Sequence, residues 1–268
     1  MELERLNGEM TRFLGMAAQY LRTPLGAITA YADFLEQGAG PMLNAEQREF
    51  LSTIQESSRF MLHLIYDLLD LSTIESGNLT LEREPPDLLP LVMRSVVLNR
   101  TLASRKSIAI HLHVDVAAPE LSLDQPKIEQ VLNNLIGNPI KFSPPGQSVT
   151  VSPGRQGEDA LIAIADNGPG IPASELQEIS VAFQKGSVRP TAGETSTVLG
   201  LAICRQIVEC HVGRIRVESR IGLGSTFHVA LYASKGRLHA VLISLSIRPG
   251  RRAYKRSYAA CRALGYRR

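Results

Sequence analysis

The sequence predicts an α+β chain with two folded parts, a long N-terminal helical hairpin and then a mixed domain of helices and strands. Apolar residues recur at helical spacing over residues 3–35 and again over 50–71, with glycine and proline at 37–42 between them. After about Leu81, short alternating runs rich in β-branched residues replace this pattern. A length of 268 residues allows one large domain or two small ones, and 44% hydrophobic with 21% charged residues is ordinary for a soluble globular protein.

The first part, residues 1–77, is expected to be two helices that pack against each other. Asn44 is predicted to cap the second helix together with Gln47 three residues later, and Gly77 to end it. The apolar face of the first helix is formed by Leu3, Leu6, Met10, Leu14, Ala17, Leu21, Leu25, Ile28 and Leu35, and that of the second by Phe50, Ile54, Met61, Leu64, Leu68 and Leu71. A hairpin alone leaves wide apolar faces exposed, so we expect a homodimer that forms a four-helix bundle.

The second part, residues 78–235, is expected to combine strands with at least two helices. Asp124 is predicted to cap a helix that carries Pro126 in its first turn and runs through Ile136. A further helix is predicted over 199–209, whereas residues 171–198 show little periodicity and read as a long loop. The predicted strands are 108–114, 148–151, 160–165, 214–218 and 225–231.

The C-terminal segment, residues 236–268, differs in charge from the rest of the chain. It holds nine Arg or Lys residues and no acid, which leaves 20 basic against 26 acidic residues elsewhere. We expect a poorly ordered extension and no nucleic-acid partner, although binding to nucleic acid, an acidic protein or a membrane surface stays open. No membrane-spanning run, no signal peptide and no metal-type spacing of the three cysteines is evident, so a soluble cytoplasmic protein is expected.

Residues 13–25 (FLGMAAQYLRTPL) resemble the phospho-acceptor segment of bacterial two-component histidine kinases. Gln19 stands where that family has its acceptor histidine, and Tyr20 stands where it has an acidic residue. Thr23 matches the residue that, in the family, orients water during dephosphorylation of a partner. A carboxamide nitrogen is a hydrogen-bond donor rather than a nucleophile, so the resemblance predicts that self-phosphorylation is lost.

Residues 130–143 (QVLNNLIGNPIKFS) resemble the first motif of the ATP-binding domain of the histidine kinase, gyrase, Hsp90 and MutL superfamily, an α/β sandwich. The resemblance implies that Asn134 and Asn138 face the nucleotide, with Asn138 as a Mg²⁺ ligand. It also places Lys141 near phosphate and Phe142 near the nucleotide. Pro139 replaces the family's alanine, and a proline inside a helix costs about 3 kcal/mol. Because proline disfavours helical conformation in the residue before it, we expect Asn138 to be displaced and Mg²⁺ binding weakened.

Further motifs of the same superfamily follow in its order. In residues 166–172 (DNGPGIP), Asp166 matches the carboxylate that accepts a hydrogen bond from the adenine amino group, and Gly168 and Gly170 let backbone approach the ligand. Lys185 lies in residues 183–187, which resemble a segment of the family's lid. Thr226, in residues 222–227 (GLGSTF), is expected near the base.

Residues 196–203 (STVLGLAI) resemble the family's glycine-rich phosphate cradle, whose pattern is GTGLGLAI. Leu199, Gly200 and Leu201 match the pattern, and Gly200 would lie at a helix N-terminus that faces phosphate. Ser196 and Val198 replace its other two glycines. A β-branched residue is the least suited to a positive φ angle, so this cradle is predicted to be impaired.

The resemblance implies a two-component sensor histidine kinase core that uses ATP and Mg²⁺ and serves a response-regulator receiver domain. Without an acceptor at Gln19, it could act in trans on a histidine-bearing kinase partner. The alternatives are a pseudokinase that dimerises or binds a regulator without phosphoryl transfer, and a degenerate chain. His63 is expected to be an ordinary helix residue, and His111 and His113 to lie on a solvated strand.

Overall fold

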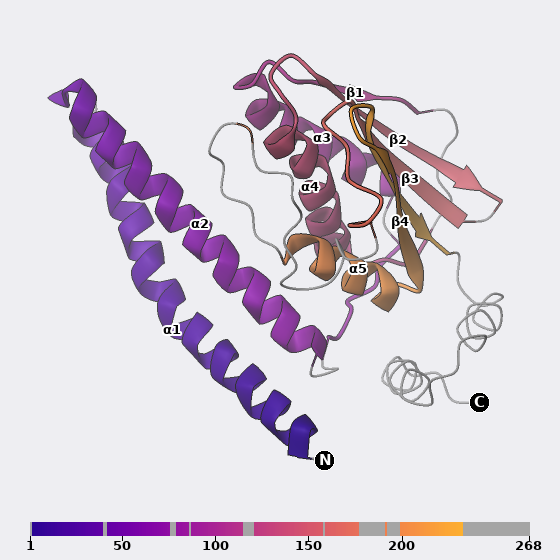
Figure 1. Cartoon of the computed structure of the whole chain (residues 1–268). Helices are drawn as coiled ribbons and strands as arrows, with labels where there is room; N and C mark the ends of the chain where they lie inside the picture. Colours follow the sequence, from indigo (N-terminus) through magenta and orange to yellow (C-terminus); the bar gives the residue numbers. More distant parts are fainter. Residues whose placement is uncertain are drawn as a thin grey trace. The chain divides into compact units, whose positions relative to one another are not determined.

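The computed structural model describes residues 2–39, 42–75, 79–85, 87–114, 121–157, 159–176, 191 and 199–232, with side chains from Leu14 onward (Figure 1). The chain divides into two compact units between Leu79 and Thr80, two residues beyond the predicted boundary. Lys185 and the predicted basic tail, residues 236–268, lie outside the described residues. No helix in the described part is both long and apolar enough to cross a membrane.

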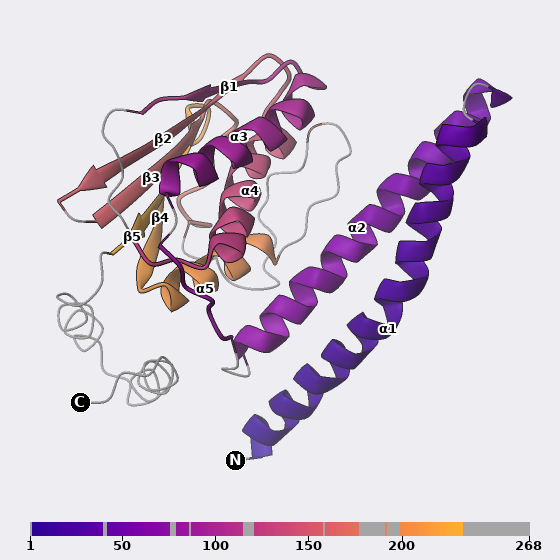
Figure 2. The same ribbon diagram turned by 180° about the vertical axis from the view of Figure 1, so that it is seen from behind.

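The first unit is a helical hairpin of α1 (Glu2–Ala39) and α2 (Ala45–Glu75), which lie side by side in both views (Figures 1 and 2). The predicted cap of α2 is confirmed, because Gln47 N donates to Asn44 Oδ1 at 2.8 Å and Asn44 N donates to Gln47 Oε1 at 3.0 Å. The helix α1 continues through Pro24. The predicted helix stop at Gly77 falls on a residue outside the described ones.

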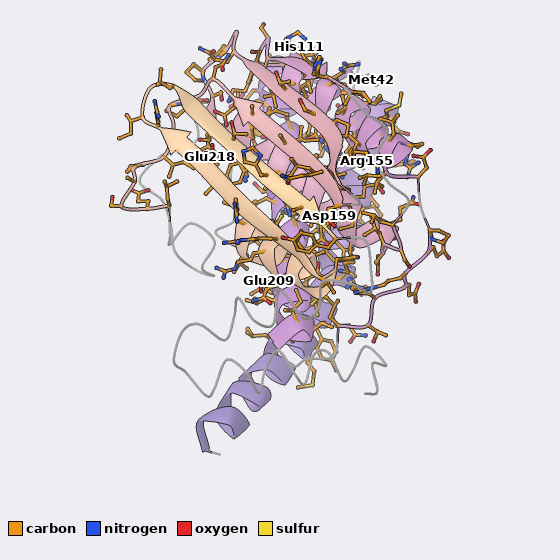
Figure 3. All side chains as sticks on the ribbon, turned by 90° about the vertical axis from the view of Figure 1, so that its right-hand side faces the viewer. Met42, His111, Arg155, Asp159, Glu209 and Glu218 are labelled. Atoms are coloured by element: carbon orange, nitrogen blue, oxygen red, sulfur yellow. The ribbon has the colours of Figure 1, made fainter. Side chains whose placement is uncertain are left out.

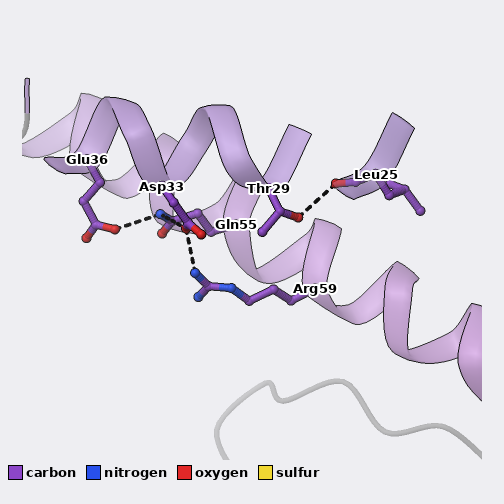
Figure 4. A network of polar contacts seen from close by, with 6 residues as sticks. All are labelled: Leu25, Thr29, Asp33, Glu36, Gln55 and Arg59. Atoms are coloured by element: carbon purple, nitrogen blue, oxygen red, sulfur yellow. Dashed lines mark hydrogen bonds and ion pairs between the residues drawn. The ribbon is translucent and has the colours of Figure 1, made fainter. Parts of the chain in front are cut away.

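A polar network centred on one buried residue lies between the two helices near their connecting turn (Figure 4). Gln55 is buried, and its Nε2 donates to Asp33 Oδ1 at 2.9 Å and to Glu36 Oε2 at 2.7 Å. Arg59 Nη2 also contacts Asp33 Oδ1 at 2.7 Å. Because a shift of one helix by a turn would separate these partners, the network fixes the register of α1 against α2.

Many large apolar side chains of the hairpin remain exposed in the single chain. Tyr31 and Phe34 on α1 are 71% and 72% exposed, and Phe50 and Ile54 on α2 are exposed as well. The apolar core between the helices is small by comparison, with Ala18, Leu25 and Ile65 buried and Leu62 and Leu69 packed against them. An exposed apolar surface of this extent is typical of an interaction face.

The second unit is a two-layer arrangement in which three helices cover one face of a five-stranded sheet (Figures 1 and 2). The sheet order is β1-β2-β3-β5-β4, with β1 parallel to β2 and all other pairs antiparallel. Figure 3 shows His111 on the edge strand β1 and Glu218 on the opposite edge strand β4. The elements are α3 (Leu88–Ser104), β1 (Ala109–Leu112), α4 (Gln125–Phe142), β2 (Ser148–Gln156), β3 (Asp159–Asp166), α5 (Gly200–Cys210), β4 (Gly213–Arg220) and β5 (Gly224–Leu231).

One helix of this unit was not predicted. Asp87 caps α3 by accepting a hydrogen bond from Leu89 N at 3.1 Å, and the helix buries a regular apolar face against α4 and β1. Strand β2 is also longer than predicted and includes Pro153. A proline lacks a donor, but β1 pairs only with residues 148–151, so Pro153 needs no partner on that edge.

The expectation that Pro139 displaces Asn138 from the helix is wrong. The helix α4 runs without interruption from Gln125 to Phe142, and Pro139 is buried within it. The turn after Pro139 is kept because Ser143 N donates to Pro139 O at 2.9 Å. Proline removes its own donor but leaves its carbonyl free to accept, so the helix can continue past it when packing holds the residue in place.

The start of α4 is tied to the end of α5 by Asp124 and His211. Asp124 Oδ1 accepts from Lys127 N at 3.1 Å, which caps α4, and Oδ2 accepts from Glu82 N at 3.0 Å. Asp124 N donates to His211 Nε2 at 3.0 Å, and His211 Nδ1 lies 2.8 Å from Ile207 O. This arrangement requires the proton of a neutral imidazole on Nδ1. Burial lowers the pKa of His211, in agreement with that neutral form.

Candidate nucleotide site and acceptor position

The predicted acceptor segment lies on an exposed stretch of α1. Gln19, Tyr20 and Thr23 are all exposed, Tyr20 by 80%. One turn away, the guanidinium carbon of Arg22 lies 4.9 Å from the ring centroid of Tyr66 on α2, which is a cation–π distance. Exposure makes this segment accessible to a partner, but the amide of Gln19 offers no nucleophilic nitrogen.

The second half of α4 presents the predicted polar residues. Asn134 and Asn138 are four residues apart in a continuous helix, so they lie on the same face, and Lys141 and Phe142 form the last turn. The Nδ2 atom of Asn134 is buried and has no hydrogen-bond partner within the described residues. A buried donor without a partner is costly unless a ligand satisfies it, so this amide fits a phosphate or ribose oxygen.

The end of α4 is held by a cluster of hydrogen bonds around Lys106 and Thr191. Lys106 Nζ donates to Ile140 O at 2.7 Å, Lys141 O at 3.3 Å and Thr191 Oγ1 at 2.6 Å. Thr191 N also donates to Lys141 O at 3.1 Å. A cation at a helix C-terminus is favourable because the last carbonyls carry partial negative charge. Lys106 therefore stabilises the turn that carries Lys141.

Asp166 ends β3 with its carboxylate held in one orientation. Its Oδ1 accepts from Gly168 N at 2.8 Å and from Ser225 N at 3.3 Å. Burial raises the pKa of the Asp166 carboxyl above its usual range, against the lowering effect of these two hydrogen bonds. Since Oδ1 is engaged with backbone, Oδ2 is the oxygen suited to accept a hydrogen bond from a ligand.

Gly168, Gly170 and Gly224 allow backbone segments to approach each other around Asp166. A Cβ at Gly168 would lie 2.6 Å from Ser143 Oγ and 2.8 Å from Asp166 Oδ1. Gly170 has φ of +72°, and a Cβ there would lie 2.1 Å from Arg220 O. Gly224 has φ of +99°, and its Cβ would lie 1.9 Å from Asp166 O. Only glycine fits at Gly170 and Gly224, where the close atoms are backbone and φ is positive, whereas a Cβ at Gly168 would require two side-chain ends to shift. These glycines pack the Asp166 loop against the β4–β5 turn.

The strand register places the side chains of Ser225 and Thr226 on opposite faces of the sheet. Thr226 pairs with Ala165, while the buried Phe227 pairs with Ile164 on the face that the helices cover. Side chains alternate along a strand, so Ser225 lies on the helix-covered face with Asp166, and Thr226 lies on the opposite face. The register thus does not support the prediction that Thr226 approaches the base, because Ser225 and not Thr226 shares the face of Asp166.

The predicted phosphate cradle is described only at its last residues. Leu199 and Gly200 are buried at the start of α5, Leu201 is half-buried, and Ile203 N donates to Leu199 O at 2.9 Å. No side chain caps this helix start within the described residues. The replaced positions, Ser196 and Val198, lie outside the described residues.

Within the described part of the chain, no group of three or more His, Cys, Asp or Glu side chains could hold a metal ion. In the family, Mg²⁺ is held by one or two protein oxygens together with the phosphates of the substrate. The residues present fit a Mg²⁺ ion that binds in this way. The helical position of Asn138 is compatible with that role. Three histidines considered in the sequence are exposed: His63 on α2, and His111 and His113 at β1. None of them belongs to a metal-binding group within the described residues.

Two family models match this chain. The His Kinase A (phospho-acceptor) domain matches residues 9–77, and the histidine kinase-, DNA gyrase B- and HSP90-like ATPase matches residues 123–235. Gln19 lies in the first matched range and Asp166 in the second. Together the two ranges cover more than half of the chain.

Curated relatives and a solved structure agree with these matches. The circadian input-output histidine kinase CikA of Synechococcus elongatus is 34% identical over 83% of this chain and 30% of its own length. The alginate biosynthesis sensor protein KinB of Pseudomonas aeruginosa is 31% identical over 85% of this chain and 37% of its own length. This chain thus spans well under half of both relatives.

The crystal structure of full-length ShkA in complex with AMPPNP has a TM-score of 0.68 and 26% identity, covering 87% of this chain and 48% of that one. The structure and these matches agree on a helical hairpin followed by an ATPase-type sheet domain. The chain therefore belongs to the histidine kinase family and comprises the core formed by its phospho-acceptor-type domain and its ATPase-type domain.

Proposed function

We propose that this chain is a nucleotide-binding histidine kinase core that does not phosphorylate itself at residue 19 and serves a histidine-bearing partner in trans. The observation that carries nucleotide binding is the fixed carboxylate of Asp166, whose Oδ1 accepts two backbone hydrogen bonds. The remaining oxygen is suited to the amino group of adenine. Asn134, whose buried Nδ2 has no hydrogen-bond partner among the residues that the structure describes, supports the polar side of the same site.

The loss of self-phosphorylation follows from the chemistry of residue 19. An imidazole nitrogen has a lone pair in the ring plane that can attack phosphorus, whereas the amide nitrogen of Gln19 has its lone pair delocalised into the carbonyl. Tyr20 also offers a phenol hydroxyl where the family has a carboxylate, so the family's general base is missing. Thr23 then has no phosphorylated neighbour to act with.

A homodimer through residues 1–77 is part of this proposal. The exposed apolar side chains of α1 and α2, including Tyr31 and Phe34, support a four-helix bundle with a second copy. A receiver domain of a response regulator is the proposed further partner, by analogy with the family. Sedimentation equilibrium should give twice the mass of the chain, and a monomer at micromolar concentration would contradict the dimer.

Calorimetric titration of the whole chain with ATP and ADP, each with and without Mg²⁺, tests nucleotide binding. We expect micromolar affinity for both, strengthened by Mg²⁺, and loss of binding in Asp166→Ala. The matched control is Asp159→Ala at the other end of β3, which should leave the affinity unchanged if it folds. Failure of the unaltered chain to bind either nucleotide would contradict the proposal.

A pseudokinase is the second candidate, and Val198 favours it. This residue stands where the family's phosphate cradle has glycine. The double variant Gln19→His/Tyr20→Glu restores the acceptor and its acid and separates the two candidates. With labelled ATP, acid-labile label on His would show that the ATP domain can transfer phosphate. Nucleotide binding without any label would favour the pseudokinase.

A further inference from the structure

The β4–β5 hairpin holds a pair of hydroxyls, Ser225 from the motif at residues 222–227 and Ser219, which lies outside every motif named above. Ser219 and Ser225 lie opposite each other in the antiparallel pair, and their Oγ atoms are 2.9 Å apart. Both lie on the face of the sheet that the helices cover, because Val217 and Phe227 beside them face the core. The pair therefore lies on the helix-covered face, next to the loop that follows Asp166.

Ser219 Oγ has all its hydrogen-bonding positions filled. It accepts from Ile171 N at 2.8 Å and donates to Gly224 O at 2.9 Å. A hydroxyl has one proton, so with that proton on Gly224 O, Ser225 must donate to Ser219. Ser219 thus joins the loop after Asp166 to the turn between β4 and β5.

A continuous set of contacts leads from Ser219 to the carboxylate of Asp166. Ser225, whose hydroxyl contacts Ser219, uses its backbone N to donate to Asp166 Oδ1 at 3.3 Å. On the other side, Ile171 anchors the loop whose Gly168 N donates to the same oxygen at 2.8 Å. Both donors that orient the carboxylate therefore depend on segments that Ser219 ties together.

The close backbone packing around this loop makes its position sensitive to small shifts. Gly222 N donates to Pro169 O at 2.8 Å, and a Cβ at Gly170 would lie 2.1 Å from Arg220 O. The loop and the turn are thus in direct backbone contact. A change in one segment must move the other, and the carboxylate between them moves too.

We propose that Ser219 is a positioning residue that sets how strongly the site selects adenine through its 6-amino group. The proposal rests on the nucleotide binding proposed above, with Asp166 as the acceptor for that amino group. Ser219 itself touches no ligand in this account. It keeps Asp166 Oδ1 on its two backbone donors, so that Oδ2 faces the base in one orientation.

The test compares ATP with purine riboside 5′-triphosphate, which lacks the 6-amino group, by calorimetry on the whole chain. Removing the Ser219 hydroxyl in Ser219→Ala leaves Ile171 N without its acceptor. We expect the Kd for ATP to rise about tenfold, the scale of one well-placed hydrogen bond. The Kd for the purine analogue should stay within about twofold, since its binding does not use Asp166. The preference for ATP should therefore nearly disappear.

Two further variants separate positioning from general destabilisation. Ser219→Thr keeps the hydroxyl and should retain the preference for ATP. Ser152→Ala removes a half-buried serine from β2 and should change neither Kd. Hydrogen exchange at the Ile171 amide, followed by NMR without nucleotide, should be slow in the unaltered chain and in Ser219→Thr and fast in Ser219→Ala.

The possible results distinguish the inference from the function on which it rests. Equal weakening of both nucleotides by Ser219→Ala, or an unchanged preference for ATP, would overturn the positioning role while nucleotide binding stands. The same holds if Ser219→Ala does not fold and Ser219→Thr loses the preference. If the unaltered chain binds neither nucleotide, the proposed function fails first and the inference fails with it.

Discussion

Replacing Pro139 with alanine should stabilise the ATP-type domain without improving nucleotide binding. Pro139 lies inside α4, three residues before the helix ends, and cannot donate to the carbonyl of Leu135. In a helix interior proline is about 3 kcal/mol less favourable than alanine. The exchange also removes two buried ring carbons, which costs about 0.8 kcal/mol each. The net expectation is a gain of about 1–2 kcal/mol in unfolding free energy.

Urea denaturation of the whole chain, followed by circular dichroism, measures this gain, and hydrogen exchange at the α4 amides assigns it to that helix. The matched control is Pro126→Ala in the first turn of the same helix, where proline fits well. That change should be neutral or slightly destabilising. Because α4 is continuous through Asn138, Pro139→Ala should alter the Kd for Mg-ATP less than about threefold. A loss of stability, or a large gain in affinity, would refute this account of the helix.

Three further predictions concern the same domain. Val212 has φ of +59°, so Val212→Asn should raise the unfolding free energy by about 1 kcal/mol in urea titrations, because asparagine tolerates this conformation and valine does not. Because the pKa of His211 is lowered in the folded state, the unfolded state binds the proton more readily. The unfolding free energy should therefore fall as the pH drops below about 6.5, and His211→Gln should reduce this dependence on pH. Gly168→Ala should abolish ATP binding in calorimetry, because the added Cβ would lie 2.6 Å from Ser143 Oγ and 2.8 Å from Asp166 Oδ1. The control is Gly146→Ala, at a turn where the added Cβ would have no atom within 4 Å, and this change should cost stability alone.

Local signals in the sequence were sufficient to predict the hairpin and most strands. The capping pair of Asn44 and Gln47 is a short-range pattern that does not depend on tertiary contacts, and it forms as predicted. The helix α3 was missed although its signal was present. Asp87 precedes a buried face with apolar residues at 88, 91, 92, 96 and 103, but the proline at position 90 and the polar Ser95 and Asn99 on that face obscured the pattern.

Errors at the site came from features that depend on tertiary packing. Whether Thr226 or Ser225 faces Asp166 is decided by strand register, and motif spacing alone does not give the face. Pro139 was expected to break its helix because propensity is a local property, yet in the folded domain Pro139 is buried and the helix is continuous. Ser219 carries no chemical signal in sequence, since one serine in a strand has many ordinary roles.

The two halves of the kinase reaction depend on this chain to different degrees. On the proposed function, holding a nucleotide relies on Asp166, which backbone donors orient, and on glycines that pack main chain against main chain. On the proposed function, accepting a phosphoryl group would need a nucleophilic nitrogen at residue 19, and the amide of Gln19 does not offer one. The function proposed above therefore combines a chain that binds ATP with a second, histidine-bearing protein, which is the component to seek if phosphoryl transfer is found.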